Sequence, residues 1–203
     1  MNTSPISEEY DGSIAILRFC RPTERNPLSA TTLDTLDEAL TRIQNQPSTK
    51  VIILTGTDDV FLSGANIREL TTLDPQTAKA FSEKGQALTN AVAKNHAITI
   101  AAINGYCMGG GLDFALACDI RIASATAVFA HPGARLGIIT GWGGTQRLPR
   151  IIGRTSAIEL FATARRLSGA EALKVGLVTQ VVDPVLEAAR NLAHQLISTS
   201  STT

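Results

Sequence analysis

Residues 100–119, IAAINGYCMGGGLDFALACD, constrain the fold of this chain most strongly, because an apolar run ends in three consecutive glycines and an amphipathic segment follows at once. Ile100–Ile103 is expected to form a buried strand, and Leu112–Ala117 the start of a helix. Glycines at such a junction permit unusual dihedral angles and let another group approach the main chain closely. The free N–H groups at the start of the helix favour negative charge, either a phosphate or the oxyanion of an attacked carbonyl.

The residues after the glycines indicate which kind of anion could bind at the start of this helix. A P-loop requires Gly-Lys-Ser/Thr, whereas Leu112 and Asp113 follow here, and the glycine spacing does not fit a dinucleotide-binding fingerprint. An acid at this point would repel a phosphate, but it can transfer protons beside a carbonyl. One interpretation is therefore an oxyanion site with Asp113 beside it. The other is a tight glycine turn in which Asp113 caps the helix.

The composition argues against several classes of protein. The chain has 203 residues with 18 basic and 18 acidic side chains, so we expect neither a nucleic-acid nor a membrane-surface partner. No apolar run approaches the roughly 20 residues of a membrane span, and we expect no secretory leader. The cysteines, Cys20, Cys107 and Cys118, lack metal-type spacing, so we expect reduced thiols in a cytoplasmic protein and no metal site.

Strands and helices alternate along the chain, which is typical of an α/β protein. Units of strand, loop and helix recur roughly every 40–50 residues, which indicates a stack of similar modules. We expect a loose lead-in over residues 1–10, one domain over 11–197 and a disordered tail over 198–203. The expected loops are residues 61–67 and 133–144. The expected strands are 13–20, 51–55, 99–103, 120–123 and 177–182, and the expected helices are 29–43, 74–94, 156–164, 170–175 and 185–197.

Five segments follow one another in a fixed order: RPTERNPLS (21–29), VIILTG (51–56), FLSGANIREL (61–70), AAINGYCMGGGLDFALACDIRIA (101–123) and LGIITGWGGTQRLPRIIG (136–153). In order and spacing they resemble the enoyl-CoA hydratase/isomerase (crotonase) family, and residues 167–182 extend the match. The resemblance implies a crotonase-like spiral of repeated ββα units, assembled as trimers or dimers of trimers. It also implies an acyl-CoA thioester as the substrate, a place in fatty acid metabolism and no further cofactor.

The resemblance places an oxyanion hole at the backbone N–H groups of Ala65 and Gly110, and the first catalytic acid at Asp113. Losing one oxyanion donor typically raises the barrier by about 3–4 kcal/mol. Trp142 is expected either to shape the acyl pocket or only to pack in the core. The residues that the resemblance assigns to substrate and CoA binding are Arg25, Pro27, Ser63, Ala65, Asn66, Ile67, Gly109, Gly110, Pro132, Gly133, Gly141 and Trp142.

The departures from the family pattern bear directly on the reaction. Typical hydratases use two glutamates, whereas this chain has the shorter Asp113 at the first position and Gly133 at the second. Each acid–base group contributes about 100- to 10,000-fold to the rate, so paired hydration lacks one partner. Three alternatives follow. In the first, Asp113 alone moves protons, as in an isomerase; in the second, His131 replaces the missing acid. In the third, the protein binds acyl-CoA without conventional turnover, or it runs enolate chemistry such as decarboxylation.

Two further expectations concern other parts of the chain. Cys107 lies in Gly-Tyr-Cys-Met-Gly, which imitates a nucleophile elbow, and Asp183 and His194 follow it, so a thiol hydrolase is a remote alternative. The family's C-terminal helical cover, which continues past the residue matching Ile197, is expected to be largely missing. Apolar surface is then expected to be exposed.

Overall fold

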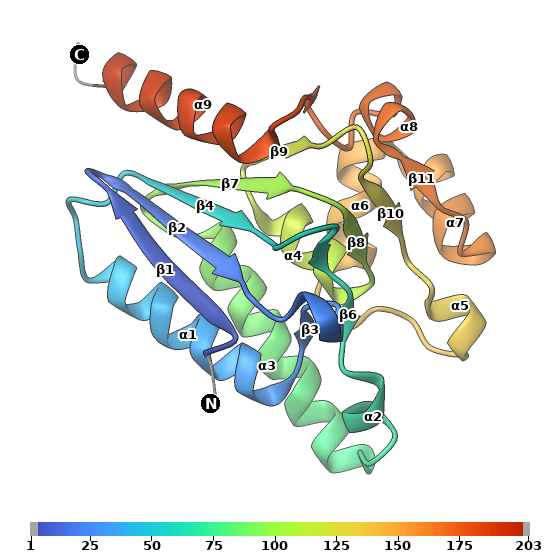
Figure 1. Cartoon of the computed structure of the whole chain (residues 1–203). Helices are drawn as coiled ribbons and strands as arrows, with labels where there is room; N and C mark the ends of the chain where they lie inside the picture. Colours follow the sequence, from blue (N-terminus) through green and yellow to red (C-terminus); the bar gives the residue numbers. More distant parts are fainter. Residues whose placement is uncertain (1–3, 201–203) are drawn as a thin grey trace.

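The computed structural model describes residues 4–200, and Figure 1 shows how their helices and strands are arranged. Within this part of the chain the largest sheet has six strands, and only its first edge strand is antiparallel to its neighbour. In spatial order the strands are β1 (Ile6–Asp11), β2 (Ile14–Phe19), β4 (Val51–Thr55), β7 (Ile98–Ile103), β9 (Ile120–Ala123) and β12 (Gln180–Val181).

Two smaller sheets lie beside the large one. The four-stranded sheet contains, in spatial order, β11 (Leu167–Ser168), β10 (Val128–Ala130), β8 (Tyr106–Met108) and β5 (Val60–Leu62). The two-stranded sheet pairs β3 (Pro27–Leu28) with β6 (Gly64–Ala65) in parallel. Successive strands β4, β7 and β9 join the large sheet, and the strands that follow them, β5, β8 and β10, join the four-stranded sheet. This alternation is the predicted α/β spiral of ββα units.

Helices connect the passes of the spiral and cover the large sheet. Ser29 accepts a hydrogen bond from the Thr32 backbone N–H, and Asp74 forms a capping box with Thr77, so the helices that follow these two residues begin where the sequence predicts them. The helices are η1 (Pro22–Glu24), α1 (Ala30–Gln44), α2 (Ile67–Leu70), α3 (Pro75–Ala93), α4 (Gly110–Ala117), α5 (Gly133–Leu136), α6 (Gly144–Ile152), α7 (Arg154–Thr163), α8 (Gly169–Lys174) and α9 (Val185–Ser200).

The central strands of the large sheet are buried on both faces, which explains their continuous apolar runs. All five residues of β4 are buried. Ile52 and Leu54 belong to the core cluster shared with α1 and α3, whereas Val51 and Ile53 belong to the cluster shared with α9. Figure 1 shows α1 and α3 on one face and α9 on the other. A parallel sheet covered by helices on both faces requires this pattern. Among the described residues, no helix has both the length and the apolar character needed to cross a membrane.

The two ends of the chain differ from the sequence-based expectation. Residues 6–11 form the edge strand β1, paired with β2, and are not a loose lead-in. The strand was missed because its exposed face is polar and acidic, and only Ile6 at its start is buried. At the other end, α9 extends to Ser200, so residues 198–200 are helical. The remaining positions of the predicted lead-in and tail, 1–3 and 201–203, lie outside the described residues.

The predicted loops contain regular structure. Residues 61–67 include strands β5 and β6, and residues 133–144 begin with the single helical turn α5. Helix α6 and the short strands β8 and β11 were not predicted. Helix α6 begins at a glycine and contains a proline, which hid it in the sequence. Strands β8 and β11 are too short for alternating hydrophobicity to reveal them. Their pairing partners lie far away in the sequence.

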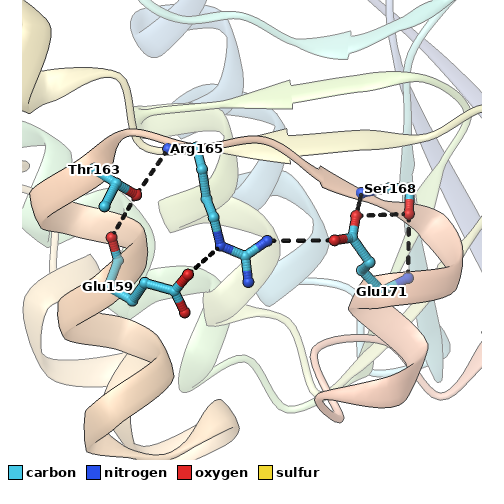
Figure 2. A network of polar contacts seen from close by, with 5 residues as sticks. All are labelled: Glu159, Thr163, Arg165, Ser168 and Glu171. Carbon is cyan, nitrogen blue, oxygen red and sulfur yellow. Dashed lines mark hydrogen bonds and ion pairs between the residues drawn. The ribbon is translucent and has the colours of Figure 1, made fainter.

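Polar contacts hold α7 and α8 together, as Figure 2 shows. Arg165 lies between the helices and forms ion pairs with Glu159 of α7, at 2.9 Å, and Glu171 of α8, at 3.4 Å. Glu171 also completes a capping box with Ser168, the residue before α8. One arginine therefore connects the end of α7 to the start of α8, and strand β11 lies between them.

Trp142 occupies a space that two glycines leave free. Its side chain is buried and packs against the rings of Phe81 and Phe114. A Cβ atom built on Gly85, in the middle of α3, would lie 2.0 Å from the indole Nε1. A Cβ built on Gly110, at the start of α4, would lie 2.5 Å from the indole Cζ3. Trp142 thus joins α3 to the start of α4.

We therefore expect Gly85→Ala to destabilise the protein, although alanine normally stabilises a helix interior by about 0.5–1 kcal/mol relative to glycine. The added methyl group meets the indole, and overpacking of this kind costs about 1–3 kcal/mol. Urea unfolding followed by circular dichroism measures the difference. In a Trp142→Ala background, which removes the whole indole, the same substitution should cost less. An equal cost in both backgrounds would contradict the proposed contact.

Candidate functional site

The start of α4 is built by backbone groups that pack without side chains between them. Strand β8 leads into Gly109, whose φ of +51° is a left-handed value that favours glycine. A Cβ on Gly111 would lie only 2.4 Å from the carbonyl oxygen of Leu62 in β5. Alanine at 111 would therefore push α4 away from β5. The glycine run exists because the helix begins in direct contact with a strand.

The two predicted oxyanion residues lie next to each other. A Cβ built on Gly64 would lie 3.1 Å from the backbone nitrogen of Gly110, which brings β6 against the first residue of α4. Ala65 and Gly110 are both half-buried, so their backbone remains partly accessible. Gly110 is the first helical residue, and the first N–H groups of a helix lack an intrahelical acceptor. The β3–β6 pairing also brings residues 25–28 beside Ala65.

Asp113 is fully buried one turn into α4 and does not cap that helix. The N-cap of α4 is Gly109, which makes no side-chain cap. The Asp113 carboxyl instead faces the loop before α6 and accepts a hydrogen bond from the Thr140 hydroxyl on Oδ2. A Cβ on Gly144 would lie 2.0 Å from Asp113 Oδ1. The carboxyl therefore fits against the N-terminal end of α6, and the alternative that it caps its own helix is wrong.

Burial raises the pKa of Asp113 from 3.8 to about 7. Three weaker effects oppose this rise: the hydrogen bond from Thr140, a hydrogen bond from the Trp142 backbone N–H and the charge of Arg147 in α6. Because removal from water dominates, the carboxyl holds its proton up to near-neutral pH. A carboxyl with such a pKa exchanges protons readily at neutral pH, as a general acid or base requires.

His131 lies against Asp113. Its Nε2 is 3.3 Å from Asp113 Oδ1, and both side chains are almost completely buried. Neither atom has a well-aligned hydrogen-bond partner among the described residues. Burial lowers the pKa of His131 from 6.5 to about 4, while burial raises that of Asp113. Despite the short distance, the two groups are therefore a neutral carboxyl and a neutral imidazole near pH 6, not an ion pair.

A cavity of about 840 Å³ lies between α5, α6 and α7, and His131 and Gly133 form part of its wall. The other lining residues are Ala134, Ile138, Ile139, Thr140, Thr145, Gln146, Pro149, Arg150, Arg154, Ala157, Ile158, Phe161 and Ala162. Ala65, Gly110 and Asp113 do not line it. The site thus has two parts: the backbone groups at the start of α4, and the cavity, with Asp113 and His131 between them.

The side chain that a second acid would need has no room at position 133. A Cβ on Gly133 would lie 2.5 Å from the carbonyl oxygen of Ile138. The α5 turn closes on itself here, because the Ile138 backbone N–H donates to the Gly133 carbonyl. Gly133 and the half-buried Pro132 therefore contribute backbone and ring surface, and no proton donor.

The remaining predicted binding residues lie around the start of α4. Arg25 is exposed, has a φ of +66° and stacks its guanidinium 4.5 Å above the Tyr106 ring. Asn66 caps α2 by accepting from the Arg68 backbone N–H, while Ile67 is exposed beside it. The carbonyl of Gly141 accepts from Gln86 of α3. Pro27 and Ser63 are half-buried. Trp142 packs in the core and is absent from the cavity wall.

The structure contradicts the thiol-hydrolase alternative. Cys107 is the fully buried central residue of β8, and burial raises the pKa of its thiol well above its usual range. Asp183 accepts from the Ala125 backbone N–H, and the exposed His194 pairs with Asp11 at 3.5 Å. A thiol without access to solvent and without a histidine is not an activated nucleophile.

Three residues of the site were missed from the sequence. Thr140 and Gly144 contact the Asp113 carboxyl, and Arg147 acts on its charge. The lone hydroxyl in the run Ile138-Ile139-Thr140 was the available signal, because a polar side chain within an apolar segment often has a partner. That the partner is Asp113, 27 residues earlier, only the fold reveals.

The sequence of this chain is similar to those of known enoyl-CoA hydratases. A family model described as enoyl-CoA hydratase/isomerase matches residues 9–203. The chain is 35% identical to a short-chain-enoyl-CoA hydratase of Clostridium acetobutylicum, over 98% of this chain and 77% of the relative. It is 36% identical to a crotonyl-CoA hydratase of Syntrophomonas wolfei, over 94% of this chain and 74% of the relative.

Solved structures with a similar sequence also have a similar fold. An enoyl-CoA hydratase from Bacillus anthracis superimposes with a TM-score of 0.92 at 36% identity, covering 96% of this chain and 77% of that protein. DspI of Pseudomonas aeruginosa also gives a TM-score of 0.92, at 32% identity, covering 97% of this chain and 81% of that protein.

The opposite pKa shifts of Asp113 and His131 predict opposite pH dependences of stability. The raised pKa of Asp113 makes its contribution to stability fall as pH rises from about 4 to 7. The lowered pKa of His131 makes its contribution rise as pH rises from about 4 to 6.5. As pH rises from about 4.5 to 6.5, the stability of Asp113→Asn should therefore increase relative to wild type. Over the same range the stability of His131→Gln should decrease relative to wild type. Each change should amount to up to about 1.4 kcal/mol per pH unit.

Urea unfolding at several pH values measures these differences, with His194→Gln on the surface of α9 as the matched control. Flat differences over this window would mean that burial shifts neither pKa. That result would contradict the neutral pair.

Proposed function

Because the chain belongs to the enoyl-CoA hydratase/isomerase family, we propose that it stabilises the enolate of an acyl-CoA thioester and moves protons on the acyl group with Asp113. The observation that carries this proposal is the position of the Asp113 carboxyl. It is buried one turn after Gly110, and its pKa is raised to about 7. A carboxyl in this state suits proton transfer next to a thioester carbonyl at neutral pH.

The proposed oxyanion donors are the backbone N–H groups of Ala65 and Gly110. Their support is the approach of β6 to the first residue of α4, together with the partial exposure of both residues. Two N–H groups directed at the thioester oxygen stabilise the negative charge that develops when a proton leaves the α-carbon. The enolate is held by hydrogen bonds, so the proposed chemistry needs no cofactor besides the CoA of the substrate.

Isomerisation of an enoyl-CoA is the proposed reaction class, within the lyase and isomerase chemistry of the family. Hydration by paired acids requires a second carboxyl, and Gly133 supplies neither the carboxyl nor the space for one. A double-bond shift needs one group that removes a proton and returns it to another carbon. We propose that Asp113 is that group.

Binding of acyl-CoA without turnover is the second candidate, favoured by the closed turn at Gly133. We propose that the CoA lies along residues 25–28 and 63–67, which the β3–β6 pairing holds together. Arg25 stacks on Tyr106 at one end of this surface and is available to a phosphate. Either candidate function uses the same binding surface.

We further propose that the protein works in the cytoplasm and assembles as a trimer or a dimer of trimers. Its three cysteines are free thiols, which suits a reducing compartment. Ile138, Ile139 and Ile158 are each 48% exposed or more around the cavity, and exposed apolar side chains gathered in this way favour association. Light scattering on the purified protein measures the mass directly.

The test of function is turnover of a panel of thioesters: crotonyl-CoA, a 3-enoyl-CoA, a dienoyl-CoA and a malonyl-type CoA. We expect the 3-enoyl-CoA to be converted, and Asp113→Asn to reduce its rate by at least about 100-fold, because the general base is lost. Calorimetry should show CoA-ester binding retained in this variant.

Asp37→Asn, an exposed aspartate on α1, is the matched control and should keep the wild-type rate. Thioester binding without turnover of any substrate would favour the binding role. Turnover that survives in Asp113→Asn would remove Asp113 from the mechanism.

A further inference from the structure

Asp113 and His131 form an isolated pair of buried polar groups. Asp113 Oδ1 and His131 Nε2 face each other at 3.3 Å, and neither has another partner among the described residues. The second carboxyl oxygen, Oδ2, is occupied by Thr140. Buried polar groups are normally hydrogen-bonded, so two unpaired atoms in contact are available to each other. A proton on either atom can reach the other with little movement.

The surroundings of the pair leave it few other charges. From α6, Arg147 acts on the Asp113 charge, and from β8, Cys107 is affected by it. On the other side, the His131 ring lies 4.9 Å from the Phe161 ring of α7. Arg150 and Arg154 are exposed and line the cavity beyond it. Among residues 4–200, no other carboxylate contributes to the pKa shift of Asp113 or of His131.

The two members of the pair differ in their access to the cavity. Asp113 has no exposed surface and does not line the 840 Å³ cavity, whereas His131 forms part of its wall. A proton that leaves Asp113 on the Oδ1 side therefore meets His131 first. Imidazole accepts a proton on one nitrogen and releases one from the other, so it can connect a buried carboxyl to solvent.

Resting on the proposed function, we infer that His131 is a positioning residue that exchanges the Asp113 proton with water in the cavity. In the isomerisation, the Asp113 carboxylate takes a proton from C2 of the 3-enoyl thioester, and the double bond moves to C2–C3 as a proton is returned to C4. Between these steps the Oδ1 proton passes to Nε2, and the Nδ1 proton leaves to water. Reversal of the relay brings a solvent proton to Asp113, so no atom or charge is lost.

The test is isomerisation of a 3-enoyl-CoA in D₂O, with deuterium in the product measured by mass spectrometry. In the wild type, exchange of the Asp113 proton through His131 competes with direct return of that proton to C4, so the product should carry deuterium. In His131→Gln, the amide cannot relay a proton, and deuterium per turnover should fall several-fold. His194→Gln is the matched control. In His131→Ala, added imidazole enters the adjacent cavity and should restore deuterium incorporation, which a purely structural role of His131 would not allow.

Failure of this inference is distinct from failure of the proposed function. Turnover with the same deuterium content in wild type and His131→Gln, or with none in the wild type, would overturn the relay while leaving the isomerase. If no thioester is converted, the proposed function fails. Nitrogen NMR of the His131 ring then tests whether Asp113 and His131 share a proton. An Nε2 resonance that moves on Asp113→Asn supports the shared proton, and an unchanged resonance overturns it.

Discussion

The close approach of α4 to strands β5 and β6 is the constraint on which the rest of the site depends. Gly111 lies against the Leu62 carbonyl with no room for a Cβ, and a Cβ on Gly64 would lie 2.9 Å from the Met108 carbonyl oxygen and 3.1 Å from the Gly110 nitrogen. Because the backbones touch, the first N–H groups of α4 lie beside β6, and Asp113 follows one turn later inside the protein. The other end of α4 is held by Arg121, which donates to the Ala115 and Cys118 carbonyls. The helix is therefore fixed at both ends.

Burial then sets the chemistry of the side chains that α4 places. Asp113 lies near the N-terminus of α6, near Arg147 and within reach of Thr140, all of which favour the ionised carboxyl. Removal from water outweighs them, and the same burial suppresses the charge on His131. The result is an acid and a base that share a contact without forming an ion pair. Such a pair costs the fold less than two buried charges, and it keeps a transferable proton in the site.

Position 133 illustrates how backbone structure limits the reaction. In this chain the turn after Pro132 closes by a hydrogen bond to the Gly133 carbonyl, and the Ile138 carbonyl fills the place of a side chain. The loss of a carboxyl there is therefore part of the conformation of the turn, and a single substitution would not restore it. In the proposed mechanism, the groups left for proton transfer are Asp113 and, through it, His131. The proposed reaction is therefore one in which a single group removes and returns a proton.

The sequence alone determined the elements whose causes are local. Apolar runs marked β4 and β7, Ser29 and Asp74 marked the starts of α1 and α3, and the ordered motifs indicated the family and its spiral fold. Short strands such as β6 and β8 escaped because they exist only through partners distant in the chain. The position of the motifs also led to the proposal of Asp113 as the acid and of Ala65 and Gly110 as the backbone donors. Only the tertiary structure decided that Asp113 faces His131 and Thr140, and that both titratable groups are neutral. Those properties depend on burial, which is the sum of contacts from several elements and has no local signal.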